Sequence, residues 1–578
     1  MQVSKLINVR RVFLALLLFT IGLCVIMMQL SGHHPTAFNF LRTKNPKVFC
    51  WVLTTPWNLP TKATAVKNTW IKRCDGAVFV TSNHTDPNFP TLALNITEGR
   101  KYLSNKSFTA FKYLYNNHLS DFDWFLKADD DTYVIMENLK HFLKGFNPSD
   151  PLYFGHYFSG YFKGKLKVPV KQGYASGGAG YVISQEALRR MQEIGSKDTK
   201  YKCRRNTGFE DGDIGICLEN LNVTLGVSLD NNRQMTFHPF NVIKELNKSP
   251  KESKMYQYIN GNISIGKEKG ARILSSNTIS FHYVSPALIY LIDFLIYDLN
   301  VHQLRASFTS LHIKSPRVFC WVLTTPGHLP TRATAVRNTW LRRCDGAMFV
   351  TTDYNDPNFP VMALNITEGR QHLSNKSFAA FKYLYNHHLQ DFDWFLKADD
   401  DTYVIIENLK HFLKGFNPSD PLYFGHHFGG KRKIPVKQGY ASGGAGYVLS
   451  QEALRRMQEI GTNDAKYQCR KNTGYEDADI GICLEKLNVT LGVSRDNNNQ
   501  MTFHSFHLLK ELNKRPTQES IYQYVNRNIK IGNQKGERIL SSSTISFHYV
   551  DPGTMYFIDF LIYDLNVHQV RGDNRYMG

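Results

Sequence analysis

One sequence unit occurs twice in this chain of 578 residues, and the duplication constrains the fold more than any other feature. The unit runs from Val48 to Val284 and again from Val318 to Val550. VFCWVLTTP begins at residues 48 and 318, whereas VKQGYASGGAGYV begins at 170 and 436, so a four-residue deletion near residue 430 separates the copies. Solenoid repeats have periods of roughly 20 to 50 residues. A period near 270 residues therefore indicates duplication of a whole domain.

The composition is that of a globular chain that can bury several cores, with 42% hydrophobic and 13% aromatic residues. The formal net charge is +20, but the basic residues are scattered and form no tract. We therefore expect no nucleic-acid partner. A small phosphate-bearing substrate would need only a few of these charges.

The N-terminal segment resembles a membrane anchor. Lys5, Arg10 and Arg11 precede an uncharged run of nineteen residues, 12–30, which is long enough to span a bilayer. A cleaved signal peptide is the competing interpretation, but its apolar region is usually roughly 7 to 15 residues long and ends at a small-residue cleavage site. Basic residues on the short N-terminal side predict a type II topology: a cytoplasmic tail (1–11), an uncleaved signal-anchor (12–30), a short stem (31–46) and a lumenal remainder.

Cysteine usage agrees with a lumenal chain. Cys24 lies in the apolar run, and each repeat holds four of the other eight cysteines. Four cysteines allow three connectivities, and buried free thiols are a further alternative. We favour pairs that close short local loops, which join the candidates in this order: Cys50 with Cys74, Cys203 with Cys217, Cys320 with Cys344, and Cys469 with Cys483. Glycosylation sequons begin at Asn83, Asn95, Asn105, Asn222, Asn262, Asn365, Asn375 and Asn488.

Within a repeat, apolar runs alternate with amphipathic ones. The pattern predicts strands over 48–55, 77–81 and 124–128, and helices over 62–73 and 104–119. This alternation is typical of an α/β fold around a mostly parallel sheet, in which ligands bind beyond the carboxyl ends of the strands. We expect domains at 47–299 and 316–570, a C-terminal tail at 571–578, and a linker at 300–315. The linker lacks the composition of a long flexible tether, so the domains should lie close together.

An acidic triplet follows one predicted strand in both repeats, in DWFLKADDDTYV at 123–134 and 393–404. Three adjacent carboxylates repel one another unless a cation or hydrogen-bond donors offset their charge. Asp129 and Asp131 point to the same side of an extended backbone, which predicts a Mg²⁺ or Mn²⁺ site that could bind a diphosphate. A solvated turn, or acids at the start of a helix over 135–142, is the alternative. The spacing excludes an EF-hand.

Four further motifs are ambiguous when taken singly. The ITEGR segment brings Arg100 near Lys106, either for phosphate binding or as a solvated surface. The glycines of SGGAGY, at 176 and 442, indicate a close backbone approach or a tight turn. Asp211, in FEDGDIGICL, either complements a helix dipole or acts as a general base. His282, in SFHYV, is either a packed core residue or a ligand.

Taken together in this order, the motifs resemble those of the core 1 β1,3-galactosyltransferase (T-synthase) family, within the β1,3-glycosyltransferase group that includes Fringe. The resemblance is carried by WFLKADDDTYV, EGR, KQGYASGGAGYV, YVISQEALRRM, the Glu-Asp helix start, TFHPF and SFHYV. It covers nearly all of each repeat and leaves out the anchor, the linker and the C-terminal tail. It implies two tandem GT-A (Rossmann-like) glycosyltransferase domains of α/β class after an N-terminal transmembrane helix.

The resemblance also implies a reaction and its residues. A Golgi enzyme of this kind transfers galactose from UDP-galactose, with Mn²⁺ (or Mg²⁺) as cofactor, to the O3 of GalNAc on Ser or Thr of a glycoprotein, with inversion. The implied proton acceptors are Asp211 and Asp477. The implied metal ligands are Asp129, Asp131, His282, Asp399, Asp401 and His548. The implied UDP contacts are Leu53, Glu98, Gly99, Arg100, Lys106, Asp129, Tyr283, Leu323, Glu368, Gly369, Arg370, Lys376, Asp399 and Tyr549.

Two departures from the family pattern concern the acceptor and the disulfides. Where members commonly carry a Trp-rich stretch, this chain reads MYQY at 255 and IYQY at 521, which puts the acceptor in doubt. Where many have a cysteine pair before SFHYV, this chain has serines, at Ser275, Ser276, Ser541 and Ser542.

Three alternatives to this function stay open. One is transfer of another sugar or to another acceptor. A second is a chaperone or glycan-binding relative without catalysis, which the intact acids, base and histidine disfavour. A third is one active domain beside a scaffolding one. Because family members tend to dimerise, a dimer or an internal pseudo-dimer is also expected.

Overall fold

The computed structural model describes residues 45–83, 85–87, 89–162, 165–166, 168–203, 206–247, 274–301, 315–352, 359–429, 435–469, 472–512 and 540–568. The expected cytoplasmic tail and anchor, most of the stem and linker, the C-terminal tail and the MYQY and IYQY segments lie outside these ranges. Within the described ranges, no helix has the length and apolarity needed to cross a bilayer.

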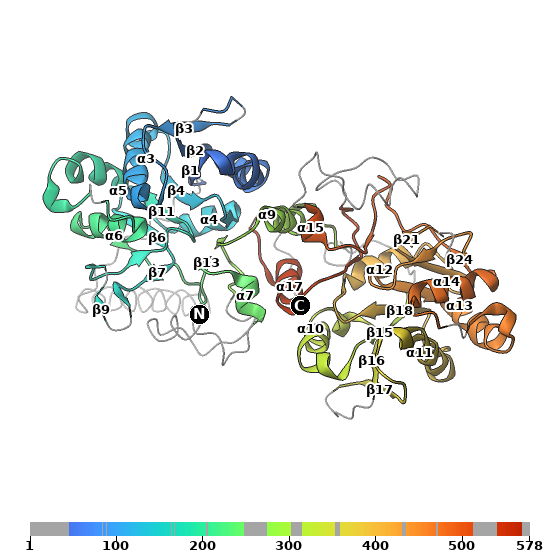
Figure 1. Cartoon of the computed structure of the whole chain (residues 1–578). Coiled ribbons are helices and arrows are strands. Elements are labelled where there is room, and N and C mark those ends of the chain that lie inside the picture. Colours follow the sequence, from blue (N-terminus) through green and yellow to red (C-terminus); the bar gives the residue numbers. More distant parts are fainter. Residues whose placement is uncertain are drawn as a thin grey trace, which may run out of the picture. The chain divides into compact units, whose positions relative to one another are not determined.

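Each repeat is built on one seven-stranded mixed sheet (Figure 1). In the first repeat the strand order is β12-β6-β11-β4-β1-β2-β3. The pairs formed by β1, β2, β3 and β4 are parallel, as is β6 with β12, whereas β11 runs antiparallel to both of its neighbours. The expectation of a mostly parallel sheet is therefore confirmed. The strands are β1 (Val48–Leu53), β2 (Gly76–Ser82), β3 (Thr91–Leu94), β4 (Trp124–Asp129), β6 (Leu152–Gly155), β11 (Tyr181–Ser184) and β12 (Thr224–Leu225).

Helices cover both faces of this sheet. Alternate residues of β1 belong to two separate cores: Val48, Cys50 and Val52 to one, and Phe49, Trp51 and Leu53 to the other. A central parallel strand is buried on both faces for this reason and has a continuous apolar sequence. The first core contains residues of α2 (Thr64–Asn68), α4 (Met136–Leu143) and α9 (Pro286–Asp293). The second contains residues of α3 (Leu103–His118), α5 (Gln185–Arg190) and α6 (Glu210–Asn220).

The helix predicted over 62–73 is not continuous, so that prediction was wrong in its interior. A π-turn segment η2 (Leu59–Ala63), the five-residue α2 and a 3-10 turn η3 (Trp70–Arg73) replace it. The helix is interrupted at Thr69, whose φ and ψ are −117° and −115°, outside the helical region. The Thr69 hydroxyl donates to the Ala65 carbonyl at 2.7 Å, and such back-bonding competes with regular helical geometry.

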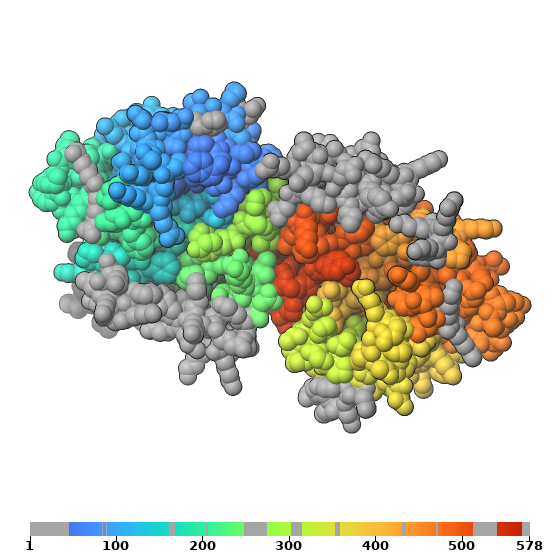
Figure 2. Space-filling model, viewed as in Figure 1, coloured from blue at the N-terminus to red at the C-terminus, as the bar shows by residue number. Residues whose placement is uncertain are grey.

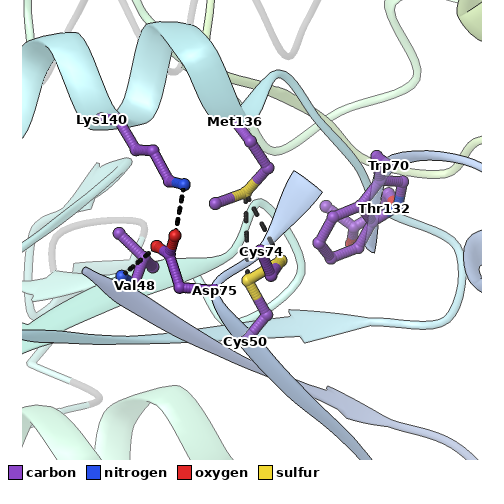
Figure 3. The surroundings of a disulfide bond; sticks show 8 residues. All are labelled: Val48, Cys50, Trp70, Cys74, Asp75, Thr132, Met136 and Lys140. Carbon is purple, nitrogen blue, oxygen red and sulfur yellow. Dashed lines mark hydrogen bonds and ion pairs between the residues drawn. A yellow bond between two sulfur atoms is a disulfide. The ribbon is translucent and has the colours of Figure 1, made fainter. Parts of the chain in front are cut away.

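Both local disulfides form in each repeat, as we expected: Cys50–Cys74, Cys203–Cys217, Cys320–Cys344 and Cys469–Cys483. Figure 3 shows that Cys50–Cys74 joins β1 to the segment after η3 and lies under Met136 of α4, whose Sδ is 3.9 and 3.7 Å from the two sulfurs. Beside it, Asp75 accepts from the Val48 N–H and from Lys140. The bridge therefore fixes the edge of α4 against the sheet.

The second repeat has the same sheet with the same order, β17-β16-β15-β18-β23-β20-β24. Figure 2 shows each repeat as a contiguous body, coloured blue to green for the first and yellow-green to red for the second. The strands of this sheet in the second repeat are β15 (Val318–Leu323), β16 (Gly346–Thr352), β17 (Val361–Leu364), β18 (Trp394–Asp399), β20 (Leu422–Gly425), β23 (Tyr447–Ser450) and β24 (Thr490–Leu491). Its helices are α10 (Thr334–Asn338), α11 (Leu373–His388), α12 (Ile406–Leu413), α13 (Gln451–Arg456), α14 (Glu476–Lys486), α15 (Leu508–Leu512) and α17 (Pro552–Asp559).

A small three-stranded sheet lies beside the main one in each repeat. It consists of β13 (Phe237–His238), β14 (Ser280–Phe281) and β5 (Tyr133–Val134), or of β25 (Phe503–His504), β26 (Ser546–Phe547) and β19 (Tyr403–Val404). Short hairpins pair β7 (Tyr157–Phe158) with β10 (Tyr174–Ala175), β8 (Tyr161–Phe162) with β9 (Lys165–Leu166), and β21 (His427–Phe428) with β22 (Tyr440–Ala441).

One hydrophobic core contains residues of both repeats. Phe281 of β14 meets Phe557 of α17 edge to face, with ring centroids 5.1 Å apart. Asn247, which ends α7 (Val242–Asn247), donates to Asp551 at 2.6 Å. The backbone N–H groups of Asn300 and Asn566 donate to the carbonyls of Ser542 and Ser276, which are equivalent positions in the opposite repeats. The two repeats thus contact each other in a nearly reciprocal way.

Candidate functional site

The acidic triplet begins on the last residue of β4, at the carboxyl end of the parallel part of the sheet. Asp129 is in register with Leu53, the last residue of β1. The turn that follows is held from outside, because Trp70 donates its Nε1–H to the Thr132 carbonyl at 2.9 Å (Figure 3). The Thr132 hydroxyl donates to the carbonyl of Gly178 at 2.7 Å. The strand and these two hydrogen bonds fix where the acids lie.

Asp129, Asp131 and His282 gather at this edge. A ligand atom of each lies within 4.8 Å of the others. The His282 ring directs its Nδ1–H to the Pro239 carbonyl at 3.0 Å, which can only accept, and this leaves Nε2 facing Asp131 Oδ1, 3.3 Å away. A backbone acceptor that fixes the tautomer of an imidazole is the usual arrangement around metal-binding histidines. Two carboxylates and an imidazole nitrogen suit Mn²⁺ or Mg²⁺, so the donor set fits the expected cofactor.

Gly178 of SGGAGY makes room for this histidine. A Cβ on Gly178 would lie 2.0 Å from the His282 ring, so only glycine fits there. The next residue, Tyr283, has φ of 56°, is 54% exposed and stacks on the His282 ring at 3.8 Å. A non-glycine residue in the left-handed region is strained, and such residues are concentrated at functional sites.

The middle acid, Asp130, is not one of the three candidate ligands and accepts hydrogen bonds from two other side chains. Asp130 accepts from the Thr54 hydroxyl at 2.7 Å and from the Asn58 amide at 2.9 Å. Asp131 accepts from Lys62 at 3.0 Å. Burial alone would raise the pKa of Asp131, but the hydrogen bond and charge of His282, together with Lys62, lower it to about 2. Asp131 is therefore ionised at neutral pH, as a metal ligand must be.

Lys127 is a site residue that the sequence reading missed. It is 2% exposed and donates to Asp129 at 2.5 Å and to the Gly177 carbonyl at 3.0 Å, with Glu210 3.8 Å away. Burial would lower its pKa, but Asp129 and Glu210 raise it above the ordinary lysine value. The buried ammonium therefore stays charged and offsets part of the acidic cluster.

Asp211 lies at the start of α6 and enters the same cleft. Its carboxylate accepts from the N–H groups of Gly177 and Gly212, at 3.2 and 3.0 Å. Burial raises the pKa of Asp211, and the N–H of Gly177 and the charge of Lys127 offset only part of this effect. The acid starts a helix, as one expectation had it. A carboxylate with a raised pKa beside a candidate metal site is suited to proton abstraction, so the role of Asp211 as a base stays a prediction that its environment favours.

One cleft of about 510 Å³ brings most of the predicted site residues together. It is lined by the acidic triplet, Asp211 and His282, and by the expected UDP contacts Leu53, Glu98, Arg100, Lys106 and Tyr283. Gly99 has φ of 133° and starts the turn that carries Arg100, but it is not among the lining residues. Lys106 is buried and pairs with Glu98 at 2.8 Å, so Arg100 is the more exposed of the two expected phosphate contacts.

The second repeat reproduces this arrangement. Asp399, Asp401 and His548 form the second group with ligand atoms within 4.8 Å. Its cleft, of about 970 Å³, is also lined by Leu323, Glu368, Arg370, Lys376, Asp477 and Tyr549, whereas Gly369 lies outside the lining. Lys397 occupies the position of Lys127 and donates to Asp399 at 2.5 Å. Burial raises the pKa of Asp477 as it does that of Asp211.

Comparison with known proteins agrees with the duplication. A family model described as Fringe-like matches residues 43–283 and again residues 313–559. Glycoprotein-N-acetylgalactosamine 3-beta-galactosyltransferase 1 of Xenopus laevis is 42% identical over 260 residues, which are 45% of this chain and 69% of that protein. Chondroitin sulfate synthase 3 of Homo sapiens is 33% identical over 193 residues, 30% of this chain and 21% of that protein. Beta-1,3-glucosyltransferase of Mus musculus is 28% identical over 180 residues, 31% of this chain and 35% of that protein.

Proposed function

The chain belongs to the Fringe-like family, and from this premise we propose that both repeats are GT-A glycosyltransferase domains that transfer galactose from UDP-galactose to the O3 of GalNAc on Ser or Thr of glycoproteins. The observation that carries the proposal is the cleft in which Asp129, Asp131 and His282 face Asp211, present in both repeats. The relative at 42% identity, named as a galactosyltransferase, supports this donor and acceptor.

In this proposal Asp129, Asp131 and His282 hold the divalent cation, Mn²⁺ or Mg²⁺, and Asp399, Asp401 and His548 hold it in the second repeat. When bound, the cation neutralises charge on the departing diphosphate. Lys127 keeps Asp129 oriented, and the Pro239 carbonyl keeps the His282 ring in the tautomer that exposes Nε2.

The remaining residues bind the donor and move one proton. Leu53, Glu98, Gly99, Arg100, Lys106 and Tyr283 contact UDP, with Leu323, Glu368, Gly369, Arg370, Lys376 and Tyr549 in the second repeat. Asp211, or Asp477, accepts the proton of the acceptor hydroxyl as that oxygen attacks the anomeric carbon from the face opposite UDP. The configuration at that carbon is inverted in this single displacement.

We also propose the topology expected from the sequence: a single-pass type II Golgi protein with an anchor at 12–30, domains at 47–299 and 316–570 in the lumen, and the two domains acting as an internal pseudo-dimer. The eight local-loop cysteines, all paired, support an oxidising compartment. In sealed Golgi vesicles we expect both domains to be protected from added protease. When detergent opens the vesicles, the protease should digest both domains. Digestion without detergent would contradict this orientation.

To test the function, the fragment of residues 31–578 is incubated with UDP-galactose, Mn²⁺ and a GalNAc-peptide, and the UDP that the reaction releases is measured. We expect Asp131→Ala and Asp401→Ala each to remove part of the activity and the double variant to remove all of it. Asp121→Ala, an exposed acid before β4, is the matched control and should leave the rate unchanged.

Two other outcomes would assign different functions. Relatives named as a glucosyltransferase and a chondroitin sulfate synthase make another donor sugar the second candidate, so UDP-glucose and other UDP-sugars are tested in parallel. A protein that binds no UDP and transfers nothing would overturn the enzymatic proposal in favour of a chaperone or glycan-binding role.

A further inference from the structure

The two clefts share their expected site residues but differ in others, including two beside the acidic triplets, where Asn58 and Lys62 of the first repeat are replaced by His328 and Arg332 in the second. Every expected UDP contact is the same residue type in both repeats, as are the metal and base residues. Two further differences in the lining lie beside the expected base and the candidate metal-site histidine and not at an expected UDP contact: Phe209 and Pro239 of the first cleft are replaced by Tyr475 and Ser505 in the second.

These two positions belong to one largely aromatic part of the lining, which we call the acceptor wall. It consists of Phe158, Phe209, Pro239 and Phe240 in the first repeat, and of Phe428, Tyr475, Ser505 and Phe506 in the second. All eight residues line their clefts. Phe158 packs against Phe240 at 6.1 Å, and Phe428 against Phe506 at 5.9 Å. The wall begins at Phe209 or Tyr475, two residues before the expected base. Since the base must touch the acceptor hydroxyl, the wall lies on the acceptor side.

Ser505 places an unsatisfied polar group in the second wall. It is 5% exposed, and its hydroxyl is buried without a hydrogen-bond partner among the described residues. Pro239, its counterpart, offers no side-chain polar atom. A buried hydroxyl without a partner costs free energy, and a ligand group that pairs with it recovers that free energy.

Tyr475 adds a second hydroxyl to the same wall. Tyr475 is 67% exposed, compared with 47% for Phe209. The chain next to Phe428 is also shorter, because the four-residue deletion falls between Phe428 and Val436, the counterparts of Phe158 and Val170. The second cleft is the larger, about 970 Å³ against 510 Å³. Ser505 and Tyr475 thus make the second acceptor side more polar, within a cleft that is larger as a whole.

We propose that the two repeats use the same donor but select different acceptors, and that the hydroxyls of Ser505 and Tyr475 make the second site specific for an acceptor with additional hydrogen-bonding groups beside the reacting sugar. A neighbouring sugar provides such groups. The first site, with Phe209 and Pro239, selects a GalNAc flanked by apolar peptide. This inference rests on the proposed function of the cleft.

The test isolates each site in the lumenal chain, residues 31–578. Asp401→Ala leaves only the first site active, and Asp131→Ala leaves only the second. Each single-site enzyme is given UDP-galactose and two acceptors: a GalNAc-peptide with apolar flanking residues, and the same peptide with a second GalNAc on the adjacent Thr. We expect the ratio of the two kcat/KM values to differ between the sites by about tenfold or more, and the KM for the donor to agree within about twofold.

Exchange variants then test the named residues in the second site. Ser505→Ala removes only the hydroxyl, and Tyr475→Phe introduces the residue of the first repeat; both should move the acceptor ratio toward that of the first site. Ser505→Pro, the full exchange, should do the same, because the first repeat already accommodates proline there. Ala379→Thr on α11 is the matched control: it also introduces the residue of the first repeat, Thr109, but lies outside the cleft lining and should leave the ratio unchanged.

Each result has a defined meaning. Equal acceptor ratios at the two sites would overturn the inference and leave the proposed function standing. One silent site would also overturn the inference, and it would restrict the proposed function to the other repeat. Different ratios that none of the three exchange variants shifts would overturn the assignment to Ser505 and Tyr475. If neither site transfers from any UDP-sugar, the proposed function itself fails.

Discussion

At the residue scale, Lys127 connects the two chemical halves of the cleft. It contacts Asp129 of the candidate metal site, and through the Gly177 backbone it is linked to Asp211, the proposed base. The sequence contained a signal for it: a lysine inside an otherwise apolar strand, two residues before Asp129 and hence on the same face. The triplet, the histidine and the helix-starting acid were predictable because their motifs recur. The partners of Lys127 were not, because they come from distant segments.

We expect Lys127→Met to be strongly destabilising. It would leave Asp129 and Glu210 without their buried counter-charge, and breaking a buried pair costs about 3 to 5 kcal/mol of unfolding free energy. Lys140→Met is the matched control, since Lys140 pairs with Asp75 in a more exposed position and should cost about 1 kcal/mol or less. Urea unfolding of the two variants measures the difference. Equal losses of unfolding free energy would show that the buried charge of Lys127 contributes no more to stability than the more exposed charge of Lys140.

Asp211 should determine the acid side of the pH dependence. A base acts only when deprotonated, so kcat/KM falls as the pH drops through its pKa. Because burial raises that pKa, kcat/KM should begin to fall at a higher pH than it would for an ordinary Asp, whose pKa is about 4. A pH-rate profile of the Asp401→Ala enzyme measures it. Asp211→Asn in that background should lower kcat by roughly 10²- to 10⁴-fold and keep UDP binding; unchanged kcat would exclude it as the base.

At the scale of elements, the strands were predictable and one helix was not. β1 and β4 are central, buried on both faces and therefore continuously apolar, so their sequences identify them. The segment 62–73 has a helical pattern, but Thr69 interrupts it and Trp70 turns away to bond the Thr132 carbonyl. A contact with a residue about sixty positions along the chain decides the local conformation there, and no local pattern contains that information.

Trp70 should therefore affect the site from outside it. Trp70→Phe would remove the hydrogen bond to the turn after the acids, at a cost of about 1 to 3 kcal/mol in stability, and weaken Mn²⁺-dependent UDP binding roughly tenfold. Trp124→Phe is the matched control, because Trp124 is equally buried and its Nε1 has no hydrogen-bond partner among the described residues. Calorimetric titration of both variants in the Asp401→Ala background decides the point. An equal loss of affinity would mean that packing, rather than this hydrogen bond, positions the acids.

At the scale of the whole molecule, the duplicated domains share a core, which the repeat alone could not predict. The length of the period established two similar domains, but not which surfaces of them meet. Phe281 lies next to His282 of the candidate metal site and packs against Phe557 of the other repeat. The stability of one site should therefore depend on the other domain.

Phe557→Ala tests this coupling. Removing a fully buried phenylalanine costs about 3 to 5 kcal/mol, and we expect the first site, measured in an Asp401→Ala background, to lose activity at a lower temperature as well. Phe381→Ala is the comparison, since Phe381 is equally buried in a core made only of second-repeat residues. The first site should be less affected by it. Heat inactivation of the first site that is unchanged by Phe557→Ala would mean that the domains are stable independently.

The disulfides have a consequence for how such a chain is made. Eight cysteines can pair in about a hundred ways, and here nearly identical sequences surround equivalent cysteines in the two repeats, so local recognition cannot distinguish the copies. Every disulfide nevertheless closes within its own repeat, over 24 or 14 residues. If the chain enters an oxidising lumen as it is made, as we propose, the first repeat can complete its oxidation before the competing thiols of the second emerge. In that compartment, the order of translation would protect the duplicated chain from exchanging partners between its halves.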